Sequence, residues 1–273
     1  MPLFMRSVAR GFLLLIAGLL AGQAAAAQVV TVGAAFFPPY VVKPGQSEHP
    51  GLLPQLLDAL NQLQDDYRFI IRPTAIPRRF ADLQDGRNDI ALFENPDWGW
   101  QDIDYDIVDM GLQDFEVFVT RSYKHRDQTY FDQLQNKRLA LFNGYHYAFA
   151  GFNANPDFLR NNFNATLTYS HDSNLLMVLH NRVDIAAVTR SYIDDFLRRH
   201  EEYAGQLLIS RKVDQSYHHM ALIRPGAAIS AVDFSALLEQ LRANGQLAAI
   251  FEPFHITVTA GAADSSVTAD AAR

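Results

Sequence analysis

The carboxylate of Glu94 is the side chain in this sequence whose position most clearly requires a chemical partner. It follows an apolar run at residues 89–93 (DIALF), which predicts a buried strand. A carboxylate there is costly unless a cationic ligand or a basic neighbour accompanies it. Arg78 and Arg79 lie close enough in the sequence to be that neighbour. Two interpretations stay open: Glu94 meets a cationic group of a ligand, or it forms a structural ion pair.

Four aromatic side chains lie on two loops that follow predicted strands. Phe37 and Tyr40 flank a Pro-Pro pair, which lacks two backbone donors and fixes φ, so the strand must end there on a rigid turn. Trp98 and Trp100 are the only tryptophans. Aromatic faces attract apolar groups and cations, and loops beyond strand ends are where α/β folds bind ligands. All four are candidate ligand contacts. The alternative is that Phe37 and the tryptophans pack in the core and that Tyr40 is a surface ring.

A third candidate segment is the turn Asn143-Gly144-Tyr145-His146, between a predicted strand and a predicted helix. Glycine lets the backbone come close to a ligand, and free N–H groups at a helix start favour an anion. We expect Asn143, Gly144 and Tyr145 to contact a ligand; a plain helix cap is the alternative.

The sequence offers little for catalysis or for metal binding. Its nine histidines are scattered, and adjacent His218 and His219 point to opposite faces of a strand, so they cannot chelate one ion together. No HExxH, GxSxG, Walker-type or GxGxxG pattern occurs, and there is no cysteine. We therefore expect no catalytic residue, no metal site and no cofactor.

The first 27 residues have the organisation of a secretory signal peptide. Arg6 and Arg10 precede an apolar stretch at residues 12–20, and four alanines at 24–27 follow. The alternative, an uncleaved anchor, would need about 20 apolar residues. We expect cleavage after residue 26 or 27 and a periplasmic protein.

The remaining composition argues against a polyanionic partner. Without Arg6 and Arg10, 21 basic residues stand against 30 acidic ones, a net charge of −9, and no basic run occurs. Nucleic acid and anionic membranes are therefore disfavoured as partners. We expect a monomer.

Short apolar strands alternate with helical patterns along the chain, which predicts an α/β fold with a largely parallel sheet. A first series ends at residue 121, and a charged segment at 122–128 separates it from a second series. The predicted strands are 29–35, 67–72, 89–93, 115–121, 138–142, 165–169, 183–188, 207–211 and 219–223. The predicted helices are 52–63, 78–83, 145–152, 174–180, 191–200, 230–243 and 246–251. The tail at 257–273 predicts disorder.

Six segments in order carry a resemblance to a known family: VGAAFFPPYV (32–41), GLLPQLLDAL (51–60), IPRRFADLQDGRNDIALF (76–93), QNKRLALFNGYHYAF (135–149), NLLMVLHNRVDIAAVTRSYI (174–193) and LRANGQLAAIFEPF (241–254). Together they resemble the bacterial extracellular solute-binding proteins of family 3, the polar amino-acid-binding type of periplasmic receptor.

The resemblance implies a two-lobed type II periplasmic-binding-protein fold with two strands crossing at a hinge. The expected crossings are residues 118–122 and 217–222. Lobe 1 would comprise residues 28–118 and 222–256, and lobe 2 residues 119–221. Ligand contacts on both lobes favour the closed state. In the family, the closed form docks on an ABC-type permease in the inner membrane.

The family's amino-acid clamp is not matched here. The Arg that grips a carboxylate is absent from the segment after Glu94, and Thr189 stands where an Asp would hold the ammonium. By position, Arg79, Thr189 and Arg190 are further candidate contacts. Each arginine could instead lie on a solvated helix face.

The resemblance therefore implies a protein that captures a small polar ligand, amino-acid-like or other, for an ABC-type importer. A sensing or accessory binding protein without a permease is the first alternative. A dehydratase-like enzyme, with Glu94 as its acting carboxylate, is the second.

Overall fold

The structure is a computed structural model that describes residues 26–42 and 51–259. The predicted signal peptide lies outside these residues, apart from Ala26 and Ala27. The tail beyond residue 259 also lies outside them. In the part of the chain that is described, no helix combines the length and the apolarity needed to cross a bilayer.

The first lobe is built on three parallel strands, β1 (Gln28–Ala35), β2 (Tyr67–Thr74) and β3 (Ile90–Glu94). Helix α2 (Leu52–Leu63) buries the leucines of its predicted apolar face and packs on β2 and on the C-terminal helices α7 (Ala231–Ala243) and α8 (Gln246–Phe251). The short helix α3 (Arg79–Gln84) packs on β1 and β3. The core joins residues far apart in sequence, such as Val32, Leu56 and Phe234.

The second lobe repeats this architecture with a later part of the chain. Strand β5 (Leu139–Phe142) pairs in parallel with β6 (Ala165–Thr168) and β7 (Ile185–Thr189). Its helices are α4 (Pro156–Phe163), α5 (His171–Leu179) and α6 (Arg190–Arg199). Two buried clusters, one around Val178 and Phe196 and one around Phe131 and Leu159, form its core.

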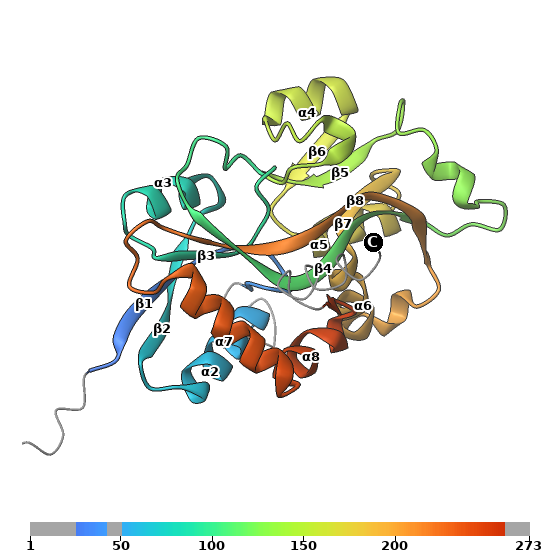
Figure 1. Cartoon of the computed structure of the whole chain (residues 1–273). Coiled ribbons are helices and arrows are strands. Elements are labelled where there is room, and N and C mark those ends of the chain that lie inside the picture. The colour runs from blue at the N-terminus through green and yellow to red at the C-terminus, as the bar shows by residue number, and fades with distance from the viewer. Residues whose placement is uncertain (1–25, 43–50, 260–273) are drawn as a thin grey trace, which may run out of the picture.

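Two long antiparallel strands, β4 (Asp106–Arg121) and β8 (Leu207–Ile223), connect the lobes. Figure 1 shows them side by side through the middle of the molecule, between β1–β3 and β5–β6. They make the described strands one sheet in the order β2-β1-β3-β8-β4-β7-β5-β6, with β9 (Thr257–Val258) beside β4. The predicted two-lobed α/β fold with two crossing strands is therefore confirmed.

The strands that pair with β4 and β8 show where the chain passes from one lobe to the other. Phe118 already pairs with Ala187 of β7 in the second lobe, whereas Met220 pairs with Glu94 of β3 in the first. On β4 the change therefore falls a few residues before the expected 118–122 crossing. We propose that the chain forms lobe 1, then lobe 2, then lobe 1 again, as the resemblance implies. The boundaries between the lobes would lie at these strand pairings.

The predicted helix at 145–152 is wrong. The structure has only a 3-10 turn at Ala148–Ala150, and Gly151 is left-handed at φ 61°. The N–H groups of Ala148 and Phe149 donate to the carboxylate of Asp214 at 2.8 and 2.9 Å, so a strand of the hinge region holds this turn. The helix α4 that the analysis missed begins five residues later, after an Asn155 cap.

Two further differences concern strands. The predicted strands 207–211 and 219–223 are the two ends of the single strand β8. The tail is not disordered from its start, because Thr257 and Val258 pair with Gln113 and Leu112 of β4. Helix α7 is capped at its start, since Ser230 Oγ accepts a hydrogen bond from the Asp233 N–H at 3.1 Å.

Candidate ligand-binding cleft

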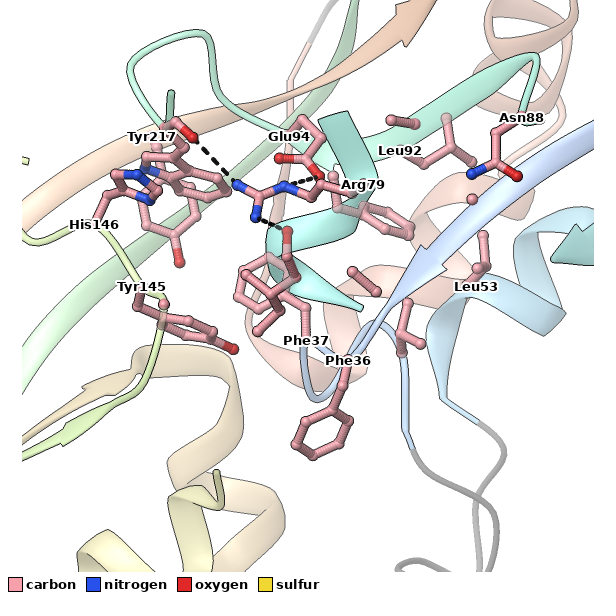
Figure 2. A pocket seen from close by; sticks show the side chains of 18 of the residues that line it. Phe36, Phe37, Leu53, Arg79, Asn88, Leu92, Glu94, Tyr145, His146 and Tyr217 are labelled. Atoms are coloured by element: carbon pink, nitrogen blue, oxygen red, sulfur yellow. Dashed lines mark hydrogen bonds and ion pairs between the residues drawn. The ribbon is translucent and has the colours of Figure 1, made fainter. Parts of the chain in front are cut away.

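A cavity of about 60 Å³ lies between the two lobes and the crossing strands. Both lobes and both long strands contribute to its lining, and Figure 2 shows Arg79, Glu94, Phe37 and Tyr145 within that lining. The polar and aromatic residues that line it are Phe36, Phe37, Arg79, Asn88, Phe93, Glu94, Trp98, Glu116, Tyr145, His146 and Tyr217.

Arg79 and Glu94 form a buried ion pair on the first-lobe side. Arg79 Nε lies 2.9 Å from Glu94 Oε1, and both residues are 7% exposed. The guanidinium also donates to the carbonyls of Ile76 and Trp98, at 2.8 and 3.2 Å. Burial raises the pKa of Glu94, although Arg79 and the indole of Trp100 oppose this shift. Of the two open interpretations of Glu94, the ion pair is confirmed, with Arg79 as the partner.

The two tryptophans have different environments. Trp98 lines the cavity, and its Nε1 donates to Gln215 Oε1 at 3.3 Å; Gln215 Nε2 in turn donates to the His146 carbonyl at 2.6 Å. This chain links the first lobe, β8 and the second lobe. Trp100 does not line the cavity: it is fully buried, and its Nε1 donates to Glu94 Oε2 at 2.9 Å.

Phe37 and Tyr40 also have different environments. Phe37 lines the cavity and meets Tyr145 of the second lobe edge-on, with ring centroids 5.4 Å apart. Tyr40 is fully buried and does not line it, so it is not the surface ring of the alternative interpretation. Its hydroxyl donates to Asp114 Oδ2 at 2.7 Å, and Ser191 Oγ donates to the same oxygen at 2.6 Å.

The turn after β5 faces the first lobe. Gly144 and Tyr145 line the cavity, while Asn143 lines an adjoining groove that shares Arg79 and His146 with it. Gly144 has φ 86° and approaches Ile76 closely. Because no α-helix starts at this turn, the expected anion-binding helix start is absent from it.

Thr189 and Arg190 do not line the cavity. Thr189 is fully buried, and its hydroxyl donates to Glu116 Oε2 at 3.2 Å. Arg190 forms an ion pair with Asp194 one helical turn later, at 3.4 Å. Both side chains are therefore engaged with the protein.

Glu116 on β4 is a lining residue that was not a candidate from the sequence, as are Phe36, Asn88, His146 and Tyr217. It is 2% exposed, and its Oε1 has no hydrogen-bond partner. Burial raises its pKa well above the ordinary value, and Asp214 and Asp114 raise it further. A signal existed in the sequence: Glu116 interrupts the apolar pattern FEVFVTR of a predicted strand, and such a charge needs a reason.

The remaining titratable groups of the lining are neutral near pH 7. Burial, with the Arg79 charge, lowers the pKa of His146 to about 4. Burial raises the pKa values of Tyr145 and Tyr217 well above 10.0. Among the described residues that line the cavity, Arg79 is thus the one cationic group, and Glu94 neutralises it.

No protein-family model and no curated protein matches this sequence. Three solved structures are similar. An ABC uptake transporter substrate-binding protein from Streptococcus pneumoniae, with bound histidine, gives a TM-score of 0.65 at 17% identity, over 83% of this chain and 92% of that one. A histidine kinase sensor domain with similarity to periplasmic binding proteins gives 0.62 at 18% identity, over 84% and 96%.

The third is an ancestral amino-acid-binding protein described as a precursor of cyclohexadienyl dehydratase, with a TM-score of 0.59 at 15% identity, over 83% of this chain and 95% of that one. At such identities the likeness concerns the fold alone. The chain therefore has the two-lobed α/β fold of the periplasmic binding proteins, as the sequence resemblance predicts.

Proposed function

We propose that the protein is an exported periplasmic binding protein that captures a small polar ligand between its lobes and performs no chemistry on it. The observation that carries this proposal is the interlobe cavity, to which Phe37 and Trp98 of one lobe, Tyr145 of the other and Glu116 and Tyr217 of the crossing strands all contribute. A ligand in contact with all of these parts is bound best when the lobes are closed. Its binding energy then shifts the protein toward the closed state.

The geometry favours binding over the dehydratase alternative. A carboxylate that acts as an acid or base must reach the atom whose proton it moves. Both oxygens of Glu94, the residue proposed for that role, are held, one by Arg79 and the other by Trp100. They are therefore not free for a substrate.

Two uses of a binding protein remain: delivery to an ABC-type importer, which we propose, and sensing without a permease. The structural similarity to a histidine kinase sensor domain supports sensing as the second candidate function. Genes for a permease and an ATPase beside this one would support the importer.

A thermal-shift screen of small polar compounds tests the proposal. A ligand that binds only the native state raises the melting temperature by mass action. Mass spectrometry should recover the compound unchanged, because a turned-over compound would indicate an enzyme. If no compound shifts the melting temperature, the proposal loses its support.

Trp98→Ala and Trp100→Ala form a matched pair for the identified ligand. We expect Trp98→Ala to weaken binding at least tenfold, with a modest loss of stability. Trp100→Ala should instead lower the free energy of unfolding by about 3–5 kcal/mol, because it leaves a cavity in the core. Unchanged affinity in Trp98→Ala would remove this ring from the site.

A further inference from the structure

Apart from Arg79 Nε, which is ion-paired with Glu94, four buried polar atoms of the cavity lining have no hydrogen-bond partner among the described residues: Glu116 Oε1, Asn88 Oδ1 and the hydroxyls of Tyr145 and Tyr217. Glu116 Oε1 is the one that belongs to a carboxylate. Buried polar groups are nearly always paired, because leaving one unpaired lowers stability, and most of all if it is charged. A ligand that donates hydrogen bonds to Glu116 Oε1 would remove this cost.

The charges of the lining favour a cation. Its acidic side chains are Glu94 and Glu116, and its one cationic side chain, Arg79, is already paired with Glu94. Ionised Glu116 therefore leaves the lining with one uncompensated negative charge. A ligand with one positive charge at this place restores neutrality in a water-poor site, where unpaired charge is most costly.

The lining offers little to a carboxylate. The three nitrogens of Arg79 are directed at Glu94 and at the carbonyls of Ile76 and Trp98. The start of helix α6, which could also receive an anion, is occupied by the protein's own Asp114, which accepts from Ser191 Oγ at 2.6 Å. A carboxylate on the ligand would meet only neutral donors, such as the hydroxyls of Tyr145 and Tyr217, and would lie close to the carboxyl of Glu116.

Aromatic rings complete the surroundings of Glu116. Phe37, Trp98, Tyr145 and Tyr217 line the same cavity, from both lobes and from β8. Faces of such rings attract ammonium groups, most strongly when water is excluded. The volume of about 60 Å³ holds only a few water molecules, so it fits an ammonium head group with a short chain. A longer chain could continue into the adjoining groove past Gly144 and Asn143.

We propose that the ligand is a small protonated alkylamine without a carboxylate, whose ammonium binds Glu116 Oε1 among the rings of Phe37, Trp98, Tyr145 and Tyr217. This inference rests on the proposed function, because it names the ligand class of the same cleft. It makes Glu116 on the crossing strand, and not a residue of either lobe's loops, the centre of recognition.

Matched pairs of compounds test the inference by isothermal titration calorimetry. Ethanolamine differs from serine, and 1,4-diaminobutane from ornithine, only by the carboxylate. We expect the amine of at least one pair to bind at least tenfold more tightly than its amino acid. Equal or tighter binding of the amino acids would overturn the inference while leaving the proposed function standing. If none of the four, and no compound of the wider screen, binds, both proposals fail.

Glu116→Gln supplies the second arm, because glutamine keeps the shape of the side chain and removes its charge. We expect the affinity for the amine to fall about 10- to 100-fold, the usual range for loss of a charge-assisted hydrogen bond. Glu202→Gln, at a side chain that is 62% exposed, is the matched control and should bind as the wild type does. An unchanged melting temperature of Glu116→Gln without ligand shows that it is folded. Wild-type affinity in that variant would overturn the inference.

Discussion

The Arg79–Glu94 pair shows how a charge near the cleft can be structural. Both side chains are buried, and each makes further hydrogen bonds, so removing one partner leaves the other charge in a site with little water. We expect Arg79→Met to lower the free energy of unfolding by about 3–5 kcal/mol. In the double variant Arg79→Met/Glu94→Gln, most of that loss should be recovered. Urea denaturation measures both.

Arg78→Met is the control for this pair. Its side chain is 58% exposed and forms an ion pair with Asp82 across one helical turn. Asp82 is buried but keeps Arg87 and Thr74 as partners, so loss of the solvated Arg78 charge should cost about 0–1 kcal/mol. If Arg78→Met and Arg79→Met lower the free energy of unfolding equally, burial of the Arg79–Glu94 pair does not make its loss more costly.

The raised pKa of Glu116 predicts how amine binding depends on pH. In the free protein, burial and the nearby carboxylates favour the protonated form, whereas a bound ammonium favours the ionised form. Binding therefore releases a proton, and affinity should rise with pH, by at most about tenfold per pH unit, until Glu116 is ionised without ligand. Calorimetry over a pH series, at pH values where the amine stays protonated, measures this slope.

The effect of Glu116 titration on affinity must be distinguished from the titration of other groups around it. Burial raises the pKa of Asp114 to about 6, so this residue also titrates in the same series. Because Asp114 is unaltered in Glu116→Gln, the difference between that variant and the wild type isolates Glu116. A wild-type affinity that does not change with pH would contradict the prediction. The remaining charged or titratable groups are Asp214, with a raised pKa, the neutral phenols Tyr145, Tyr147 and Tyr217, neutral His146, and Arg79 in its ion pair with Glu94.

Residue identity and position in the sequence located part of the cavity lining. Arg79, Glu94, Trp98, Gly144 and Tyr145 were candidates and do line it, because each lies on or next to a loop that follows a strand end or precedes a helix. Whether they contact a ligand stays a prediction. The sequence could not show that Glu116 lies among them, because this depends on how β4 crosses beside β8 and the turn after β5.

At the scale of elements, Gly144 controls how closely the turn after β5 approaches the first lobe. A Cβ at this position would lie 3.1 Å from Cγ2 of Ile76. We expect Gly144→Ala to hold the lobes slightly apart and to weaken ligand binding several-fold. Alanine at its φ of 86° also costs about 1–2 kcal/mol of stability. Calorimetry and denaturation measure the two effects separately.

Gly151 provides a matched control for this substitution. It too is left-handed, at φ 61°, but a Cβ there would meet nothing within 4 Å. Gly151→Ala should therefore show the loss of stability without the loss of affinity. If both variants bind the ligand equally well, close approach at Gly144 is not required for the closed state.

Local sequence patterns predicted most helices and strands. They failed where contacts with a distant segment determine the secondary structure. The apolar spacing of α2 and the alternation of β1 carry enough local information. The segment 145–152 has only two good helix formers, Ala148 and Ala150; Asp214 accepts hydrogen bonds from its N–H groups and Gly151 is left-handed, so no α-helix forms. For α4 the signals were present in Asn155 and Pro156, a cap followed by a proline in the first turn.

At the scale of the whole molecule, the order of segments predicted two lobes, but not how closely they meet. That depends on contacts between residues more than 50 positions apart, such as Phe37 with Tyr145. Another is Asp114, which accepts hydrogen bonds from Tyr40 of one lobe and from Ser191 of the other. Such contacts have no local signature in a sequence.

The closeness of the lobes leads to a prediction about motion in solution. Phe37 packs on Tyr145, Gln215 joins Trp98 to the His146 carbonyl, and only about 60 Å³ remains between them. A ligand larger than a few water molecules does not fit this volume, so we expect the lobes to separate to admit it. The free protein should therefore open about β4 and β8, and bound amine should return it to the closed form.

Small-angle X-ray scattering of the protein without residues 1–27, the predicted signal peptide, measures this motion. The closed form should have a radius of gyration of about 18 Å, the value usual for a compact chain of this length. We expect a larger value without ligand and a decrease toward about 18 Å as the amine that binds in the calorimetric test is added. Glu116→Gln should remain expanded at the concentration that closes the wild type, because it lacks the charge that holds the ammonium. One radius for the free and the liganded wild type would mean that the lobes do not hinge, and binding would then have to occur in a rigid cleft.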